Sequence, residues 1–346
     1  MAGKKPADDA AFRQLKKDVA AGTLGSLYIF HGEEAYLRDF YLGKMKSILL
    51  TGGLDDFNYH ALSARDYSPQ RLRELVDAMP MMSERTMIVV MDCDVFKGDK
   101  DGLMTVLSDL PDYVCLIFVY DVIDFKADAR LKLTGLIKEK GSIVDFPRQQ
   151  QGDLTDWIFR RFKAMGRDIS TEDARYLIFL CGDLMTGLIS EIGKIGSYAK
   201  GQRVTRRDID AVATPQLDAV VFQLTDAIAA GDYGKAFSVL GDLLHMQEPP
   251  IKILAALGRQ LRQLYTARLA IENRRDTAWL MKLWGLRSSY PAEKLMRSAR
   301  AFSLTWCREA VLACEETDLA MKSQVRGDPE ALFTDLLLRL AGSDKK

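Results

Sequence analysis

The stretch LRELVDAMPMMSERTMIVV, residues 72–90, joins a short helical pattern to an apolar strand through a proline and two methionines. Its apolar residues first recur at helical spacing, at Leu72, Leu75, Val76 and Met79. We expect Pro80 to end this helix. The apolar run 86–91 that follows contains two valines and an isoleucine, which is typical of a strand covered on both faces. The stretch therefore predicts a helix that leads into a buried strand.

Met81 and Met82 are adjacent on the predicted loop between that helix and that strand. Neighbouring side chains on a loop point in different directions, so a small turn buries at most one of them at low cost. An exposed, flexible apolar pair suggests contact with a partner. Spacing alone nevertheless favours the alternative, in which the two methionines plug the sheet edge or a neighbouring helix.

Strands and helices alternate on either side of this stretch. The strands are expected at 27–30, 57–62, 86–91, 114–120 and 142–146. This alternation predicts a mostly parallel sheet with helices on both faces. From Gly152 onward the pattern predicts helices without a further strand, with Ser170 and Thr205 as helix caps. Thr214-Pro215 is the best boundary within this helical part. The fold class is therefore an α/β domain followed by two all-helical domains.

Length and composition restrict the class of protein. A chain of 346 residues is expected to form two or three domains. Apolar runs all fall short of the roughly 20 residues that span a bilayer, and the N-terminus lacks the apolar core of a secretory signal, so we expect no membrane contact and a cytoplasmic location. The five cysteines are odd in number and widely spaced, which favours buried reduced thiols. Three distant histidines and no CxxC or HExxH motif make a metal site improbable.

Charge is distributed unevenly along the neutral chain. Residues 1–124 carry 14 basic and 20 acidic side chains, a net charge of −6. Residues 125–212 carry a net charge of +4, and residues 213–346 carry +2. The N-terminal part therefore repels nucleic acid on average, and charge alone predicts no DNA-binding surface.

The segment from Leu27 to Tyr41 has the order strand, glycine and helix start, where a phosphate-binding loop of the form GxxxxGK[ST] would lie. Counted from Gly32, the positions for Gly, Lys and Ser/Thr hold Leu37, Arg38 and Asp39. Glu33 and Glu34 at the helix start would repel a polyphosphate. Asp92 and Asp94 follow a strand as magnesium ligands would, but without the loop they are better explained as turn residues. The sequence predicts neither catalysis nor a cofactor.

Six patterns occur in an order that identifies a family. They are GEEAYLRDF (32–40), AMPMMSERTMIVV (78–90), LIFVYDVIDFKADARLKL (116–133), DLTDWIFRRF (153–162), VFQLTDAIAAGDYGKA (221–236) and PPIKILAALGRQLRQL (249–264). Together they resemble the delta subunit of the bacterial DNA polymerase III clamp loader over nearly the whole chain. The resemblance implies an AAA+-like domain without a functional P-loop at 1–147, a small helical lid domain at 148–213, and a helical collar for oligomerisation at 214–346.

The resemblance also implies a function in DNA replication. The family's subunit binds the ring-shaped beta sliding clamp and opens it for loading onto primed DNA, in an assembly with other clamp-loader subunits that join through the collar. The clamp-binding pair corresponds to Met81 and Met82, with Leu72, Leu75 and Met79 supporting the loop or sharing the contact. The resemblance implies an aromatic residue or leucine at this pair in many family members. Two methionines depart modestly from that pattern: they keep an apolar plug but make it less rigid.

A basic cluster in the predicted collar consists of Arg287, Tyr290, Lys294, Arg297 and Arg300. A solvated basic face is the favoured interpretation. The alternative is contact with primer-template DNA through phosphates and an aromatic stack. Arg203, Arg206 and Arg207 are expected at the surface, and contact with DNA is the alternative for them as well. Two other functions stay open at this point: an active AAA+ ATPase, and a helical DNA-binding regulator that uses the segment near Arg206.

Overall fold

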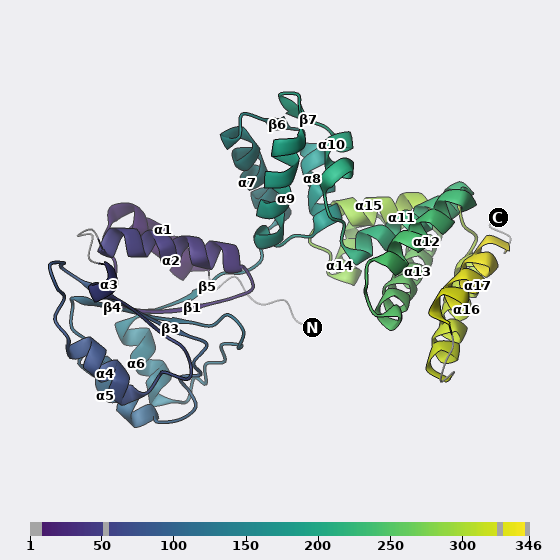
Figure 1. Cartoon of the computed structure of the whole chain (residues 1–346). Helices are drawn as coiled ribbons and strands as arrows, with labels where there is room; N and C mark the ends of the chain where they lie inside the picture. The colour runs from purple at the N-terminus through teal and green to yellow at the C-terminus, as the bar shows by residue number, and fades with distance from the viewer. Residues whose placement is uncertain (1–8, 51–54, 324–327, 343–346) are drawn as a thin grey trace. The chain divides into compact units, whose positions relative to one another are not determined.

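The computed structural model describes residues 9–50, 55–323 and 328–342. The chain divides into two compact units (Figure 1). The first extends to Gln149 and also takes in Leu184–Thr186, and the second comprises Gln150–Asp183 and Gly187–Lys346. The finer division into domains 1–147, 148–213 and 214–346 stays a prediction.

The first unit is built on a five-stranded parallel sheet. In the order in which they lie side by side, its strands are β2 (Tyr59–Leu62), β3 (Thr86–Met91), β4 (Val114–Val119), β1 (Leu27–His31) and β5 (Ser142–Asp145). The central strands β3 and β4 are almost wholly buried, and their register sets Val89 opposite Ile117. Their continuous apolar composition follows from cover on both faces.

Two layers of helices cover the sheet (Figure 1). One face carries α1 (Asp9–Ala21) and α2 (Ala35–Leu49), and the other carries α4 (Pro69–Asp77), α5 (Lys100–Ser108) and α6 (Lys132–Lys140). Alternate strand residues serve the two cores: Met87 and Val89 pack with the first layer, and Ile88 and Val90 with the second. The predicted parallel α/β architecture is confirmed.

Two element boundaries differ from the prediction. Helix α4 begins as expected, with the Ser68 side chain accepting from the Arg71 N–H and Pro69 in the first turn, but it ends at Asp77. Met79 therefore lies outside the helix, because the residue before a proline is sterically kept from the α conformation. The strand expected at 57–62 begins only at Tyr59, since Phe57 belongs to the short helix α3 (Asp55–Asn58).

In a parallel sheet, all loops that lead into strands lie at one edge, the amino edge, and all loops that follow strands lie at the opposite, carboxyl edge. Residues 55–58 and 78–85 precede the neighbouring strands β2 and β3, so both lie at the amino edge of the sheet. Gly32, Asp92 and Asp121 follow strands and lie at the carboxyl edge. Ligands of open parallel sheets bind at that carboxyl edge, so the methionine loop lies at the other end from a nucleotide site.

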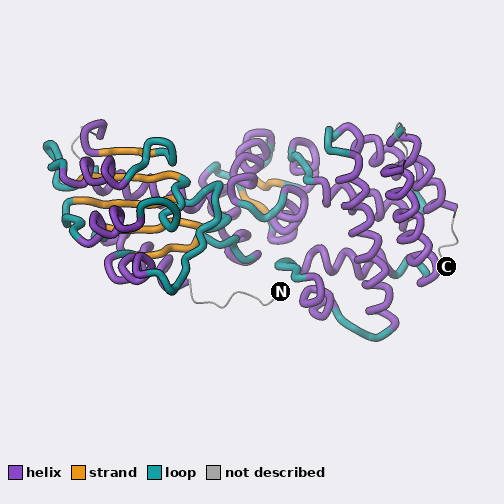
Figure 2. Tube along the Cα trace, turned by 90° about the horizontal axis from the view of Figure 1, so that it is seen from below, coloured by secondary structure: helices purple, strands orange, loops and turns teal. Residues whose placement is uncertain are grey.

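The second unit is almost entirely helical (Figure 2). Its first helices are α7 (Gln151–Ala164), α8 (Thr171–Cys181), α9 (Met185–Tyr198) and α10 (Arg206–Val212). The prediction of no further strand is wrong, because this unit contains a small pair of parallel strands, β6 (Asp168–Ile169) and β7 (Arg203–Val204). Strands of two residues are too short for hydrophobic alternation to reveal them. Ser170 and Thr205 stand at the starts of α8 and α10, as predicted.

The described residues of this unit form seven further helices. They are α11 (Leu217–Ala230), α12 (Tyr233–His245), α13 (Pro250–Glu272), α14 (Thr277–Trp284), α15 (Ser289–Ala299), α16 (Leu304–Ser323) and α17 (Pro329–Gly342). The long helix α13 packs against α11, α15 and α16 around one apolar core. None of the helices in the described part of the chain is both long and apolar enough to cross a membrane.

Candidate protein-docking site

Three exposed methionines form what we call the methionine tip: Met79, Met81 and Met82. Their exposed fractions are 78%, 54% and 84%. The two methionines of the pair are therefore not buried against the sheet edge or a helix, which was the interpretation that spacing alone favoured. Leu72 and Leu75, by contrast, are buried in the core between α4 and the sheet. They support the helix beneath the loop and add no exposed surface.

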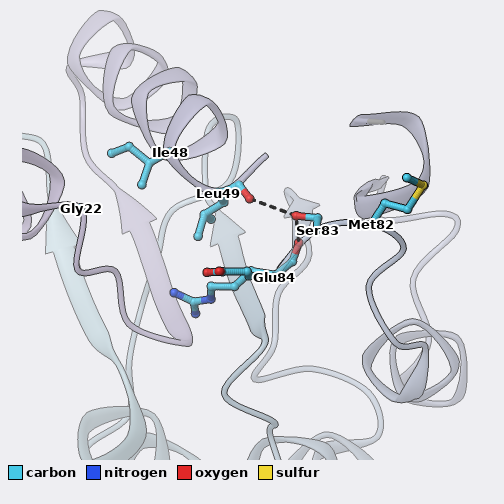
Figure 3. A pocket seen from close by; sticks show the side chains of 7 residues that line it. Gly22, Ile48, Leu49, Met82, Ser83 and Glu84 are labelled. Atoms are coloured by element: carbon cyan, nitrogen blue, oxygen red, sulfur yellow. Dashed lines mark hydrogen bonds between the residues drawn. The ribbon is translucent and has the colours of Figure 1, made fainter. Parts of the chain in front are cut away.

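The loop that carries the methionine tip is hydrogen-bonded to Asn58, the last residue of α3 at the same edge. The side-chain amide of Asn58 donates to the Met81 carbonyl, and its oxygen accepts from the Met81 N–H, both at 2.8 Å. The Ser83 hydroxyl donates to the Leu49 carbonyl (Figure 3). Hydrogen bonds thus hold this surface loop at the residue on each side of Met82.

Arg85 provides the strongest attachment at the end of the same loop. Its guanidinium donates to the carbonyls of Leu24 at 2.6 Å, Gly25 at 2.9 Å and Val114 at 3.1 Å. These carbonyls precede or begin strands β1 and β4, so one side chain joins the entry to β3 with the entries to two neighbouring strands. Hydrogen bonds from a charged donor are stronger than neutral ones.

Met82 has a backbone φ of +52°, in the left-handed region. A side chain with a Cβ atom adopts this conformation at a cost of roughly 1–2 kcal/mol. In Figure 3 the Met82 side chain points away from Ile48 and Leu49, which line a pocket together with Met82, Ser83 and Glu84. Such strain is maintained by the surrounding contacts, and strained residues are common at functional sites.

Sequence reasoning missed Asn58, Arg85 and Phe57. Phe57 is 55% exposed and directly precedes Asn58, and the sequence prediction had placed both in a strand. Asn58 and Met81 are 23 positions apart, so no local pattern links them. The only available signal for Arg85 was a charged residue at the very start of an apolar run.

The carboxyl edge, where a nucleotide would bind, is occupied by the protein's own contacts. Arg38 takes the position of the P-loop lysine, and its buried guanidinium donates to Asp121 Oδ1 at 2.6 Å and to the Tyr120 carbonyl at 3.4 Å. Gly32 has a φ of +118°, and a Cβ atom there would meet the backbone of Phe146 at 2.5 Å. The turn is therefore packed against β5 and its continuation, and the basic side chain at the P-loop lysine position is already engaged.

Asp92 and Asp94 act as turn residues, as predicted. Asp92 Oδ1 accepts the backbone N–H groups of Asp121, Val122 and Ile123, at 2.8, 2.8 and 3.3 Å. Asp94 accepts the N–H of Phe96 at 3.1 Å. Within the described residues, no group of three or more His, Cys, Asp and Glu side chains is arranged to hold a metal ion.

The basic cluster of the second unit divides into two parts. Arg287, Arg297 and Arg300 are exposed. Lys294 forms an ion pair of 2.5 Å with Asp226, and the Tyr290 ring packs 5.2 Å from that of Phe179. These two side chains hold α15 against α8 and α11, so they are engaged within the chain, and DNA contact through the three arginines stays a prediction.

Arg203, Arg206 and Arg207 are all exposed, as expected, and Arg206 is also engaged within the chain. The Arg206 guanidinium lies 3.6 Å from the centroid of the Tyr176 ring. The Tyr176 hydroxyl donates to Asp210 at 2.5 Å. Burial, followed by the Asp210 hydrogen bond, raises the pKa of Tyr176 well above its usual range. A structural cation–π contact therefore explains Arg206 without nucleic acid.

Comparison with known proteins confirms the resemblance stated from the sequence. Residues 218–340 match the family model described as the C-terminal domain of the DNA polymerase III delta subunit. The DNA polymerase III subunit delta of Bacillus subtilis is 24% identical over 344 residues, which cover 95% of this chain and 97% of that protein. The probable DNA polymerase III subunit delta of Aquifex aeolicus is 23% identical over 325 residues, or 91% of each chain.

The fold is also shared with a solved relative. The structure of the Bacillus subtilis DNA clamp loader delta protein covers 96% of this chain and is itself covered completely, with a TM-score of 0.57 and 20% sequence identity. This likeness confirms the predicted fold class, an α/β N-terminal part followed by a helix-rich remainder.

Proposed function

We propose that this chain is a clamp-loader subunit that binds the beta sliding clamp through the methionine tip and opens its ring for loading onto primed DNA. The observation that carries the proposal is an exposed apolar group on a loop that is held at the Met81 backbone and by the side chains of Ser83 and Arg85. Mobile methionine side chains on a fixed backbone suit insertion into an apolar pocket. The similarity to delta subunits supports the clamp as the partner.

The methionine tip supplies enough apolar surface for a specific contact. A fully buried methionine contributes about 1.5–3 kcal/mol relative to an exposed one. Fixing the loop in advance reduces the ordering cost of binding. Because a ligand shifts an equilibrium by its differential affinity, a tip that fits one ring conformation better holds the ring in that conformation. Ring opening therefore requires no chemistry within this chain.

An active AAA+ ATPase is the principal competing function. Arg38 is engaged by Asp121 and Tyr120, and Glu33 lies at the turn where phosphates would need donors. Phosphoryl transfer depends on positioned basic groups and metal ligands around the phosphates. We therefore infer a non-catalytic subunit, with nucleotide hydrolysis left to other members of an assembly that joins through the helices of residues 214–346.

The proposal is tested by measuring the affinity of the purified chain for the sliding clamp by surface plasmon resonance. The Met81→Ala, Met82→Ala double variant is expected to bind at least about tenfold more weakly, from the apolar area that it removes. Val122→Ala is the matched control, since Val122 is 84% exposed but lies at the carboxyl edge. Undiminished binding by the double variant would remove the site assignment, and no binding by the native chain would remove the function.

A second measurement separates the proposal from the ATPase. ATP hydrolysis by the isolated native chain is expected to equal the buffer background. Turnover by the native chain above that background would contradict a non-catalytic subunit and favour the competing function.

A further inference from the structure

Asn58 makes two hydrogen bonds to a single residue of the methionine tip. Its amide nitrogen donates to the Met81 carbonyl and its oxygen accepts from the Met81 N–H, each at 2.8 Å. The planar amide therefore pairs with the N–H and the carbonyl of Met81, as the backbone of a neighbouring strand would. Asn58 is 2% exposed, so water does not readily replace it. Met81 is consequently held at a defined distance from the residue that precedes β2.

This contact also bears on the strained residue next to it. Met82 keeps a φ of +52° between Met81, which Asn58 holds, and Ser83, which contacts the Leu49 carbonyl. Strained backbone persists only where surrounding contacts determine it. Loss of the Asn58 contacts frees one side of Met82, and the tip can then relax to other conformations.

Phe57 adds exposed aromatic surface beside the same contact. Its ring is 55% exposed although phenylalanine is usually buried in an α/β domain. It directly precedes Asn58, whose side chain reaches the Met81 backbone, so it belongs to the same part of the amino edge as the methionine tip. Aromatic residues are enriched in protein interfaces and dominate their energetics.

We propose that Asn58 is a positioning residue for the methionine tip and that Phe57 extends the apolar surface that the sliding clamp covers. This inference rests on the proposed function. It commits to the clamp as the occupant because Phe57 lies in continuity with the methionine tip, which is the surface proposed to bind it. The docking site therefore consists of Phe57 and Asn58 of α3 and of the loop 78–85, which lie apart in the sequence.

The first test uses the chain by itself and does not depend on the clamp. Hydrogen exchange is measured on the native chain and on Asn58→Ala. Protection of the Met81 amide by Asn58 Oδ1 predicts faster exchange at Met81 in the variant, while the buried amides of β3 exchange as in the native chain. Asn58→Asp keeps the acceptor and loses the donor, so it is expected to retain more protection than alanine. Unchanged exchange at Met81 would overturn the positioning role.

The second test is a double-mutant cycle on clamp affinity. Asn58→Ala is expected to weaken binding roughly 3- to 10-fold, the range for one or two net hydrogen bonds. If Asn58 acts through the tip, the same substitution costs clearly less in a Met82→Ala background. An equal loss in both backgrounds would show a general structural effect and overturn the inference, while the proposed function would stand.

Phe57 is tested on the same sensor surface. Phe57→Ala is expected to weaken clamp binding roughly 3- to 10-fold while the midpoint of thermal unfolding stays unchanged, because the ring is exposed. Val122→Ala again serves as the exposed apolar control. Native affinity in Phe57→Ala would remove this residue from the surface. A native chain that does not bind the clamp would overturn both the proposed function and the surface, and the exchange result would then stand alone as evidence on Asn58.

Discussion

Arg38 Nη2 lies 2.6 Å from Oδ1 of Asp121, and this contact joins the start of α2 to the end of β4. The Arg38 side chain is 3% exposed, whereas Asp121 reaches solvent. In an enzyme that transfers phosphoryl groups, the basic side chain at this position would face the nucleotide. Here it fastens two parts of the carboxyl edge together. The contact is therefore structural, and its role can be measured as stability.

Arg38→Ala is expected to lower the free energy of unfolding by about 2–3 kcal/mol, because it removes buried charge-assisted hydrogen bonds and leaves the Tyr120 carbonyl without this donor. Urea denaturation followed by circular dichroism measures the change. The matched control is Arg71→Ala, whose ion pair with Glu74 is exposed at both ends. That control is expected to change stability by less than about 1 kcal/mol. Equal losses in the two variants would contradict a structural role for the Arg38 contact.

Met82→Gly is expected to raise stability and weaken clamp binding at the same time. Glycine adopts positive φ without the Cβ penalty, so relief of strain is expected to contribute about 1 kcal/mol, reduced by the greater freedom of glycine in the unfolded chain. Met79→Gly is the control, since Met79 is equally exposed but has no positive φ. Thermal unfolding distinguishes the two variants. A stability gain in both, or in neither, would show that the Met82 conformation is not strained.

Arg85→Lys is expected to destabilise the first unit by about 1–2 kcal/mol, and Arg85→Ala by about 2–3 kcal/mol. A lysine ammonium cannot reproduce the planar fork that reaches the carbonyls of Leu24, Gly25 and Val114. Arg65→Ala, at an exposed position, provides the control. Urea denaturation is again the measurement. A lysine variant as stable as the native chain would show that charge alone, without the geometry, is sufficient.

The parts of the fold that repeat along the chain were predictable from the sequence. Alternating strands and helices gave the parallel sheet, and Ser68-Pro69 gave the start of α4, because both depend on neighbouring residues. The geometry of the docking site depends on distant pairs. Asn58 contacts Met81 and Arg85 contacts Leu24 across 23 and 61 positions. No periodicity reports such contacts, and the left-handed conformation of Met82 is equally invisible without them.

The burial of the cysteines predicts how stability changes in alkali. Burial raises the pKa of Cys115 and Cys181 to about 12, and that of Cys307 and Cys314 to about 11. A thiol in the unfolded chain loses its proton near a pKa of about 8.5. Between these values the unfolded state binds fewer protons than the folded state, so the free energy of unfolding is expected to fall as pH rises from about 9 to 11.

Urea denaturation under reducing conditions at pH 7, 9 and 10.5 measures this dependence. Cys115→Ala is the informative variant, because it removes the most deeply buried thiol. Its stability is expected to be lower than that of the native chain at pH 7, where a small cavity is the only difference, and the gap is expected to narrow as pH rises. Tyr28, whose pKa burial raises to about 12, adds to the slope in both proteins. A gap that stays constant up to pH 10.5 would mean that the Cys115 thiol ionises alike in the folded and unfolded states.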